Sequence, residues 1–424
     1  MPDFDLLVRA RTPDDSPLAL GITDGVIAAA GPELHGSATE EHDFGAAVLL
    51  PGWIDAHVHF NEPGRADWEG LHSGSLALAA GGGTTFFDMP LNSTPPVVTR
   101  ATLEEKRRIA EETSHLDFAL WGGLTPDSLP FLEPMAEAGA VGFKAFMCHS
   151  GLDEFPAADA RTLNSGMRIA KSLGLPVAVH AELPHPVDVS GKDMAAWLAS
   201  RPIFFELDAI ALALEIAGET GASLHIVHVT CPEGIDLVSE AKSRGVDVTV
   251  ETCPHYLLLD RQDAARIGPA AKCAPPLRSN ETLRRMWDKL LTGEIDTIGS
   301  DHSPSPPDLK QGDDIFAMWG GIAGIQHGLP LMLSRSVGFL PQISSNVAER
   351  FLLAGKGALL PGNDADFFLI EPTDRGITTS DLITRHAISP YIGMKPRFAV
   401  TSTWLRGRRV TAETRGRFLT PTRS

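Results

Sequence analysis

The chain has 424 residues, 43% of them hydrophobic, and a formal net charge of −18. A chain this long and apolar can bury a large core, which argues against disorder and suits a barrel enzyme with an added lobe. Because such an acidic surface repels phosphate backbones and anionic lipids, we expect no nucleic-acid or membrane partner. The acidic N-terminal residues show no secretion signal, and a cytoplasmic location is expected.

Short alternating segments broken by Gly, Pro and Asp occupy residues 1–50, and similar segments return near the C-terminal end. Such segments are typical of antiparallel strands, which we predict at 5–10, 17–23, 26–30, 365–371 and 400–410. Because two β-rich ends flank one large middle, we expect them to pair. The predicted product is a small β-sandwich lobe built from residues 1–50 and 355–424.

The middle of the chain, residues 51–354, alternates apolar strand-like runs with helical patterns. Helices are predicted, for example, at 69–80, 103–112, 158–173, 205–218 and 233–243. Eight strands are predicted, at 48–60, 84–90, 116–124, 140–147, 176–182, 223–230, 247–256 and 296–303. Eight such units predict an α/β fold, a TIM (β/α)8 barrel. A doubly wound open sheet would instead place a Gly-rich loop after the first strand, whereas Gly81-Gly82-Gly83 precedes the second.

Potential metal ligands stand at the ends of several predicted barrel strands: His57, His59, His180, His228 and Asp301. Alternate side chains of a strand share a face, so His57 and His59 both point into the barrel mouth. An isolated His-x-His pair is a weak signal. Active sites of TIM barrels lie at this end of the strands, and neutral imidazoles are good metal ligands. The shared position therefore predicts a metal site.

Lys144 lies within the apolar run 140–147. A buried lysine is costly unless it is neutralised or paired. It can reach solvent with its amine, or it can add carbon dioxide and become an anionic carbamate that bridges two cations. Beside a histidine cluster the second interpretation is favoured.

Two further histidines have other interpretations. His225 precedes His228 by three residues, so strand alternation places it on the opposite face, packed against a helix. For His255, two interpretations remain open: it lines the pocket, or it has a structural role. Cys148 and Cys273 are expected to pack in the core, and the four widely spaced cysteines predict neither a disulfide framework nor a zinc knot.

The ligand set, in this order on barrel strands, resembles the binuclear amidohydrolase superfamily. Local strings narrow the resemblance to its cyclic amidases, which include dihydroorotases, hydantoinases and allantoinases. These strings are Glu251-Thr252-Cys253-Pro254-His255-Tyr256, Ser300-Asp301-His302-Ser303-Pro304 and Asp364-Ala365-Asp366. Matching strings run from Pro51 to about Arg397, so the resemblance covers nearly the whole chain.

The resemblance implies a role for each candidate ligand. His57, His59 and Asp301 would hold one metal, and His180 and His228 the other. Lys144, modified to N6-carboxylysine, and a hydroxide would bridge the two, and Asp301 would carry the proton. The cofactors would be two divalent metal ions, with zinc expected and manganese, cobalt or iron also compatible. Relatives are often tetramers, so a homo-oligomer is expected.

The substrate implied is a small cyclic ureide. Dihydroorotases resemble one another in a His-x-His-x-Arg string, whose arginine can bind the substrate carboxylate. This chain has Asn61 at that place, which favours a neutral substrate. Strings around Asn92, Ala274 and Gly320 resemble allantoinases, and with Asn61 these residues are the predicted substrate contacts. Hydantoinases, then dihydroorotases, remain alternatives, as does a non-catalytic relative acting as an interaction protein.

Overall fold

The computed structural model describes residues 2–422. Its centre is a barrel of eight parallel strands, of which the third is divided in two. The barrel closes where Val58 forms a parallel bridge with His302 and the His59 amide donates to the His302 carbonyl at 2.8 Å. The predicted TIM barrel is confirmed. Its strands are β5 (Trp53–Val58), β6 (Gly83–Asp88), β7 (Asp117–Leu120) with β8 (Gly122–Gly123), β9 (Phe143–Phe146), β10 (Val177–His180), β11 (Leu224–Ile226), β12 (Val248–Thr252) and β13 (Thr297–Ile298).

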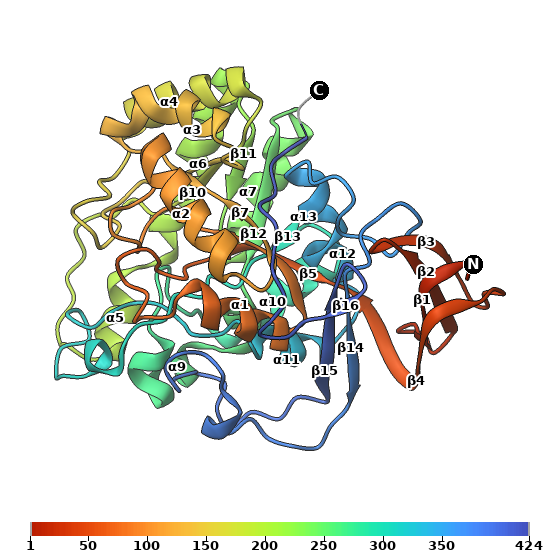
Figure 1. Cartoon of the computed structure of the whole chain (residues 1–424). Coiled ribbons are helices and arrows are strands. Elements are labelled where there is room, and N and C mark those ends of the chain that lie inside the picture. Colours follow the sequence, from red (N-terminus) through yellow and green to blue (C-terminus); the bar gives the residue numbers. More distant parts are fainter. Residues whose placement is uncertain (1, 423–424) are drawn as a thin grey trace.

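Helices surround the barrel (Figure 1). The N-termini of two helices are fixed by capping side chains. Thr99 forms a capping box before α2, and the Asp159 carboxylate caps α4. The helices are α1 (Leu71–Ala80), α2 (Arg100–Thr113), α3 (Leu132–Glu137), α4 (Ala160–Leu173), α5 (Met194–Ser200), α6 (Ile203–Thr220), α7 (Pro232–Ser243), α8 (Pro254–Leu258), α9 (Arg261–Ile267), α10 (Asn280–Leu291), α11 (Gly328–Leu333), α12 (Leu340–Ile343) and α13 (Ser345–Arg350).

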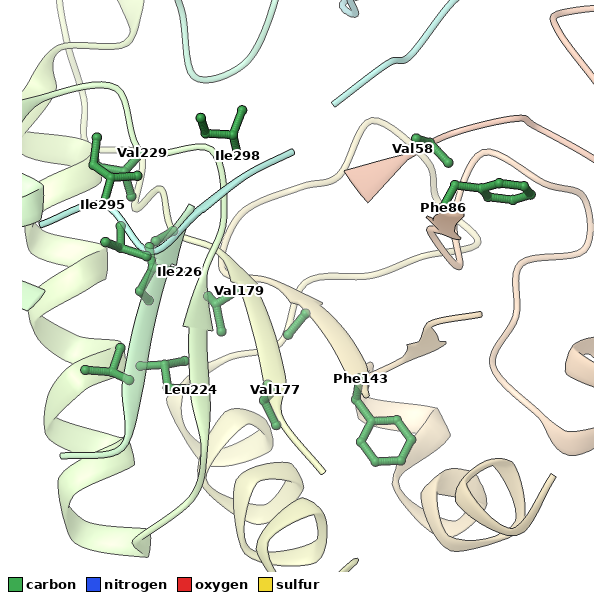
Figure 2. Packing of buried hydrophobic residues seen from close by; sticks show 14 of the residues in the cluster. Val58, Phe86, Phe143, Val177, Val179, Leu224, Ile226, Val229, Ile295 and Ile298 are labelled. Atoms are coloured by element: carbon green, nitrogen blue, oxygen red, sulfur yellow. The ribbon is translucent and has the colours of Figure 1, made fainter. Parts of the chain in front are cut away.

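The strands carry buried apolar side chains on both faces, as parallel strands covered by helices do. One large cluster packs between the strands and the helices, and Figure 2 shows Val177, Val179, Leu224 and Ile226 of that layer. A second cluster, which includes Ile54, Ala119 and Val227, fills the barrel interior. The barrel interior is therefore a packed core, and the space for a ligand lies at the strand ends.

The predicted β-rich lobe is confirmed and consists of one seven-stranded sheet in the order β16-β15-β14-β4-β1-β2-β3 (Figure 1). The sheet has an N-terminal half, β1–β4, and a C-terminal half, β14–β16. The long strand β4 joins the two, because it pairs with β1 on one side and, near its end, with β14 on the other. One apolar core takes side chains from both halves, among them Val8 and Phe367. The seven strands of the sheet are β1 (Phe4–Arg11), β2 (Pro17–Thr23), β3 (Val26–Gly31), β4 (Ala38–Pro51), β14 (Phe367–Pro372), β15 (Phe398–Leu405) and β16 (Arg408–Arg409).

Most of the predicted barrel strands are longer than the observed ones, and three of them differ for clear structural reasons. The run 48–60 is divided between β4 in the lobe and β5 in the barrel, because the chain passes from one sheet to the other at Gly52. The run 247–256 ends earlier, since Pro254 begins helix α8. The run 296–303 contributes only Thr297–Ile298 as strand. Among the described residues, no helix is both long and apolar enough to cross a membrane.

A buried charge cluster joins the lobe to the barrel. The Lys356 ammonium lies 2.6 Å from both Asp117 Oδ2, at the start of β7, and Asp366 Oδ2, beside β14. Arg406 also pairs with Asp117. The carboxylates raise the pKa of Lys356, although its burial acts in the opposite direction. Lys356 also pairs with Asp364 and Asp366 within the lobe, but Asp117 has its two cationic partners only while the lobe is docked.

Replacing Lys356 with methionine is expected to lower the free energy of unfolding by about 3–5 kcal/mol, because it leaves buried carboxylates uncompensated. Denaturant unfolding followed by circular dichroism measures this change. Arg108→Met is the matched control, since Arg108 pairs with Glu112 on the surface and its loss is expected to cost less than about 1 kcal/mol. Equal effects of the two substitutions would contradict the structural role of the cluster.

Candidate active site

A cavity of about 470 Å³ opens at the carboxyl ends of the barrel strands. Five predicted ligands lie on its wall: His57, His59, His180, His228 and Asp301. They come from the ends of β5, β10 and β11 and from the segment after β13. The structure therefore brings together residues that are distant in sequence, at the end of the barrel where TIM-barrel chemistry takes place.

The first cluster joins two histidines to one carboxylate. His57 Nε2 and His59 Nε2 each lie 3.3 Å from Asp301 Oδ1. Although burial raises the pKa of Asp301, these histidines hold it well below its usual range. Burial lowers the pKa of His57, which favours the neutral imidazole. An ionised carboxylate and neutral imidazoles are the forms that bind metal.

The second cluster consists of His180 and His228, whose Nδ1 and Nε2 atoms lie 2.9 Å apart. The His180 ring is stacked on Phe146, and its Nε2 lies 2.9 Å from Glu182 Oε2. Burial and the neighbouring His180 lower the pKa of His228 well below its ordinary value. For His180, burial acts in the same direction, but Cys148 and Glu182 raise its pKa to about 9.

Left-handed backbone conformations turn two ligands into the cavity. His228 has φ of 44° and Asp301 has φ of 46°, in a region that residues other than glycine rarely adopt. Strand alternation ends at each of these positions. The prediction for His225 is therefore wrong: it lies inside the barrel between Thr249 and Glu251, and the turn at His228 brings that side chain to the same side.

Lys144 lies close to both clusters. It is buried on β9, and its charge acts on the pKa values of both His57 and His228. Its Nζ has no hydrogen-bond partner among the described residues, and burial lowers its pKa to about 8. A buried amine without a partner is costly as it stands. A modification or a bound group at this atom would relieve that cost.

Glu251, on β12, is a residue whose role the sequence analysis missed. Its Oε1 lies 2.7 Å from His57 Nδ1, so the carboxylate fixes the orientation of that ring and leaves Nε2 facing Asp301. Burial disfavours its charge, but His57 and His225 lower its pKa to about 2. Gly299 makes room for this carboxylate, since a Cβ there would lie 2.6 Å from Glu251 Oε2.

Glu251→Gln is expected to weaken metal affinity by about 10- to 100-fold, because an amide orients and polarises the His57 ring less well. Metal competition with a chromogenic chelator measures this loss. Glu251→Gln keeps the volume and polarity of the side chain, so the circular dichroism spectrum is expected to stay unchanged. Unaltered metal affinity would mean that Glu251 only fills space.

The predicted substrate contacts separate into two groups. Asn92, Ala274 and Gly320 line the cavity with the predicted ligands. Asn61 is fully buried, and its Nδ2 donates to the Pro304 carbonyl at 3.3 Å. Asn61 is not among the described residues that line the cavity, and its buried Oδ1 has no hydrogen-bond partner among them. A direct substrate contact of Asn61 therefore stays a prediction.

The donor set fits a divalent metal ion. Ligand atoms of His57, His59 and Asp301 lie within 4.8 Å of one another. Imidazole nitrogens combined with carboxylate oxygens suit zinc and its first-row neighbours. The unpartnered Lys144 amine next to them is consistent with a further anionic ligand at that atom. The pattern of titratable groups is that of a metal-dependent site.

Known proteins share this organisation over the whole chain. Residues 48–410 match the model of the amidohydrolase family. An allantoinase of Rubrobacter xylanophilus is 48% identical, with 100% of this chain and 99% of the relative covered. An allantoinase of Deinococcus radiodurans is 46% identical, with 99% of each chain covered.

A solved structure supports the same relationship. The L-hydantoinase (dihydropyrimidinase) of Arthrobacter aurescens superimposes with a TM-score of 0.92 at 33% identity, covering 98% of this chain and 100% of that one. The resemblance inferred from the ligand set and the local strings is confirmed. The chain belongs to the amidohydrolase family.

Proposed function

We propose that this protein is an allantoinase, which hydrolyses the hydantoin-ring amide of allantoin to give allantoate. The observation that carries the proposal is the likeness to allantoinases at 46–48% identity along the full chain. The cavity supports it, because it gathers a base, imidazole ligands and hydrogen-bonding groups at one end of a barrel. The relationship to solved hydantoinases makes a hydantoinase the second candidate.

Two sets of residues would hold the metals. His57, His59 and Asp301 form one set, and His180 and His228 the other. A pair of divalent metals, for which we expect zinc, supplies Lewis acidity that polarises the scissile carbonyl and acidifies water. The orientation of the first set depends on Glu251, as described above.

Lys144 is the residue proposed to join the two sets. A pKa of about 8 leaves a minor fraction of its amine neutral near neutral pH, and only this fraction is nucleophilic. The neutral amine can attack carbon dioxide, forming an N–C bond and releasing one proton, which yields N6-carboxylysine. The new carboxylate would provide oxygens beside both histidine pairs, where the unmodified amine has no partner.

Asp301 is proposed as the proton carrier. Its carboxylate is ionised and lies on the cavity wall. It accepts a proton from the attacking water as the new C–O bond forms, and it returns this proton to the ring nitrogen as the C–N bond breaks. This return matters because an unprotonated amide nitrogen is a poor leaving group. The ring opens to a carboxylic acid and a neutral ureido nitrogen, and the acid then releases its remaining proton to solvent.

A side-by-side assay tests the proposal. Purified protein is given allantoin, hydantoin and dihydroorotate in turn, and bound metal is measured on the same sample. We expect the largest kcat/KM with allantoin. Preferential hydrolysis of hydantoin would favour the second candidate, and hydrolysis of dihydroorotate alone would overturn both. A protein without bound metal and without turnover would indicate a non-catalytic relative.

A further inference from the structure

A lysine on the cavity wall, Lys272, is unused by the mechanism above. We propose that Lys272 determines specificity by binding a carbonyl oxygen of an arm attached to the substrate ring, outside the amide that is cleaved. This inference rests on the proposed function, since allantoin is a hydantoin ring that carries a ureido arm. According to this inference, the ureido arm binds at the part of the cavity wall that Lys272 forms.

The contacts of Lys272 hold its ammonium at the cavity. Its Nζ lies 4.3 Å from the centre of the Trp197 ring, and Trp197 lines the same cavity. It donates to the Met318 carbonyl at 2.5 Å and, more weakly, to the Phe316 carbonyl at 3.4 Å. An ammonium has three N–H donors. One donor is left for a further acceptor, and the side chain is already ordered for it.

Among the described residues, no protein carboxylate forms a direct ion pair with Lys272. Arg201, another cation on this wall, is paired with the buried Glu182. Burial and Arg201 lower the pKa of Lys272 to about 8, and Asp314, which pairs with Lys192, raises it only from beyond ion-pair distance. The amine therefore stays mostly charged near neutral pH. A buried cation on a cavity wall, without a carboxylate in direct contact, favours an oxygen acceptor from the ligand.

The chemistry of the ligand matches this wall. A ureido carbonyl is a strong, uncharged acceptor, so it can accept from Lys272 without requiring an anionic substrate. A hydantoin without the arm has no corresponding oxygen. The same lysine therefore separates ring substrates that carry a carbonyl-bearing arm from those that do not, because a buried donor left without an acceptor is penalised.

The test compares Lys272→Met with Lys310→Met. Lys310 is also buried and binds the same segment, donating to the Gly321 carbonyl at 2.8 Å and to the Trp319 carbonyl at 3.3 Å. It is not among the described residues that line the cavity. Both substitutions loosen the segment 316–321, but only one removes a group from the cavity. Methionine keeps an apolar chain against Trp197.

For each protein we measure the KM for allantoin and the inhibition constant of hydantoin, the ring without the arm. The expected result is a rise of about 10- to 100-fold in the KM of Lys272→Met, with the hydantoin constant changed less than about threefold. Lys310→Met is expected to shift both constants by a similar factor.

Two other outcomes are distinguishable. If wild-type protein hydrolyses allantoin but Lys272→Met changes both constants equally, as Lys310→Met does, Lys272 only supports the segment and the inference is overturned. If wild-type protein hydrolyses hydantoin in preference to allantoin, the proposed function is wrong. The proposal that Lys272 binds a ureido arm of the substrate is then wrong as well.

Discussion

Replacing Lys144 with alanine is expected to remove both bound metal and hydrolytic activity, and added acetate or propionate is expected to restore part of each. The reason is that the proposed carbamate provides two carboxylate oxygens, and alanine leaves a space in which a short carboxylic acid can take their place. The buried, unpartnered Nζ of the unmodified lysine identifies the position of that space. Metal analysis and the rate of allantoin hydrolysis, with and without the acid, measure both effects.

Lys106→Ala is the matched control for this experiment. Lys106 is equally buried, but its ammonium lies 2.9 Å from Asp88 Oδ2 and 2.8 Å from the Met89 carbonyl. Its loss is expected to lower stability, as the loss of a buried ion-pair partner does, without any recovery by carboxylic acids. Full metal content in Lys144→Ala would refute the carbamate.

Asp301→Asn is expected to reduce kcat by about two to four orders of magnitude, because an amide can neither accept the proton from water nor return it to the ring nitrogen. The substitution keeps the shape of the side chain and an oxygen that can face His57 and His59. Rates are therefore compared per bound metal, with thermal unfolding as a check of the fold. A near-normal kcat at equal metal content would remove Asp301 as proton carrier.

Much of the fold could be predicted because parallel strands covered by helices leave an unambiguous apolar pattern. The gathering of His57, His59, His180, His228 and Asp301 around one cavity also follows from their places at strand ends. Their metals and the modification of Lys144 stay predictions. Boundaries were less predictable: a run of apolar residues does not show that the chain changes sheets at Gly52.

Other features depend on the backbone in three dimensions. Strand alternation predicted opposite faces for His225 and His228, and the left-handed backbone at His228 removes that alternation. A sequence pattern carries no sign of such a turn at a histidine. The role of Glu251 was similarly hidden, because its partner His57 is on a different strand and only their 2.7 Å separation shows the connection.

The pairing of β4 with β14 has a consequence for how the chain is made. Pro51 pairs with Phe367, so the ribosome must complete the entire barrel before the lobe can acquire its second half. Until then, β1–β4 have an open sheet edge and an apolar face without a partner, a combination that promotes aggregation. We therefore expect chains interrupted before residue 367 to depend on chaperones, even where every barrel residue is present.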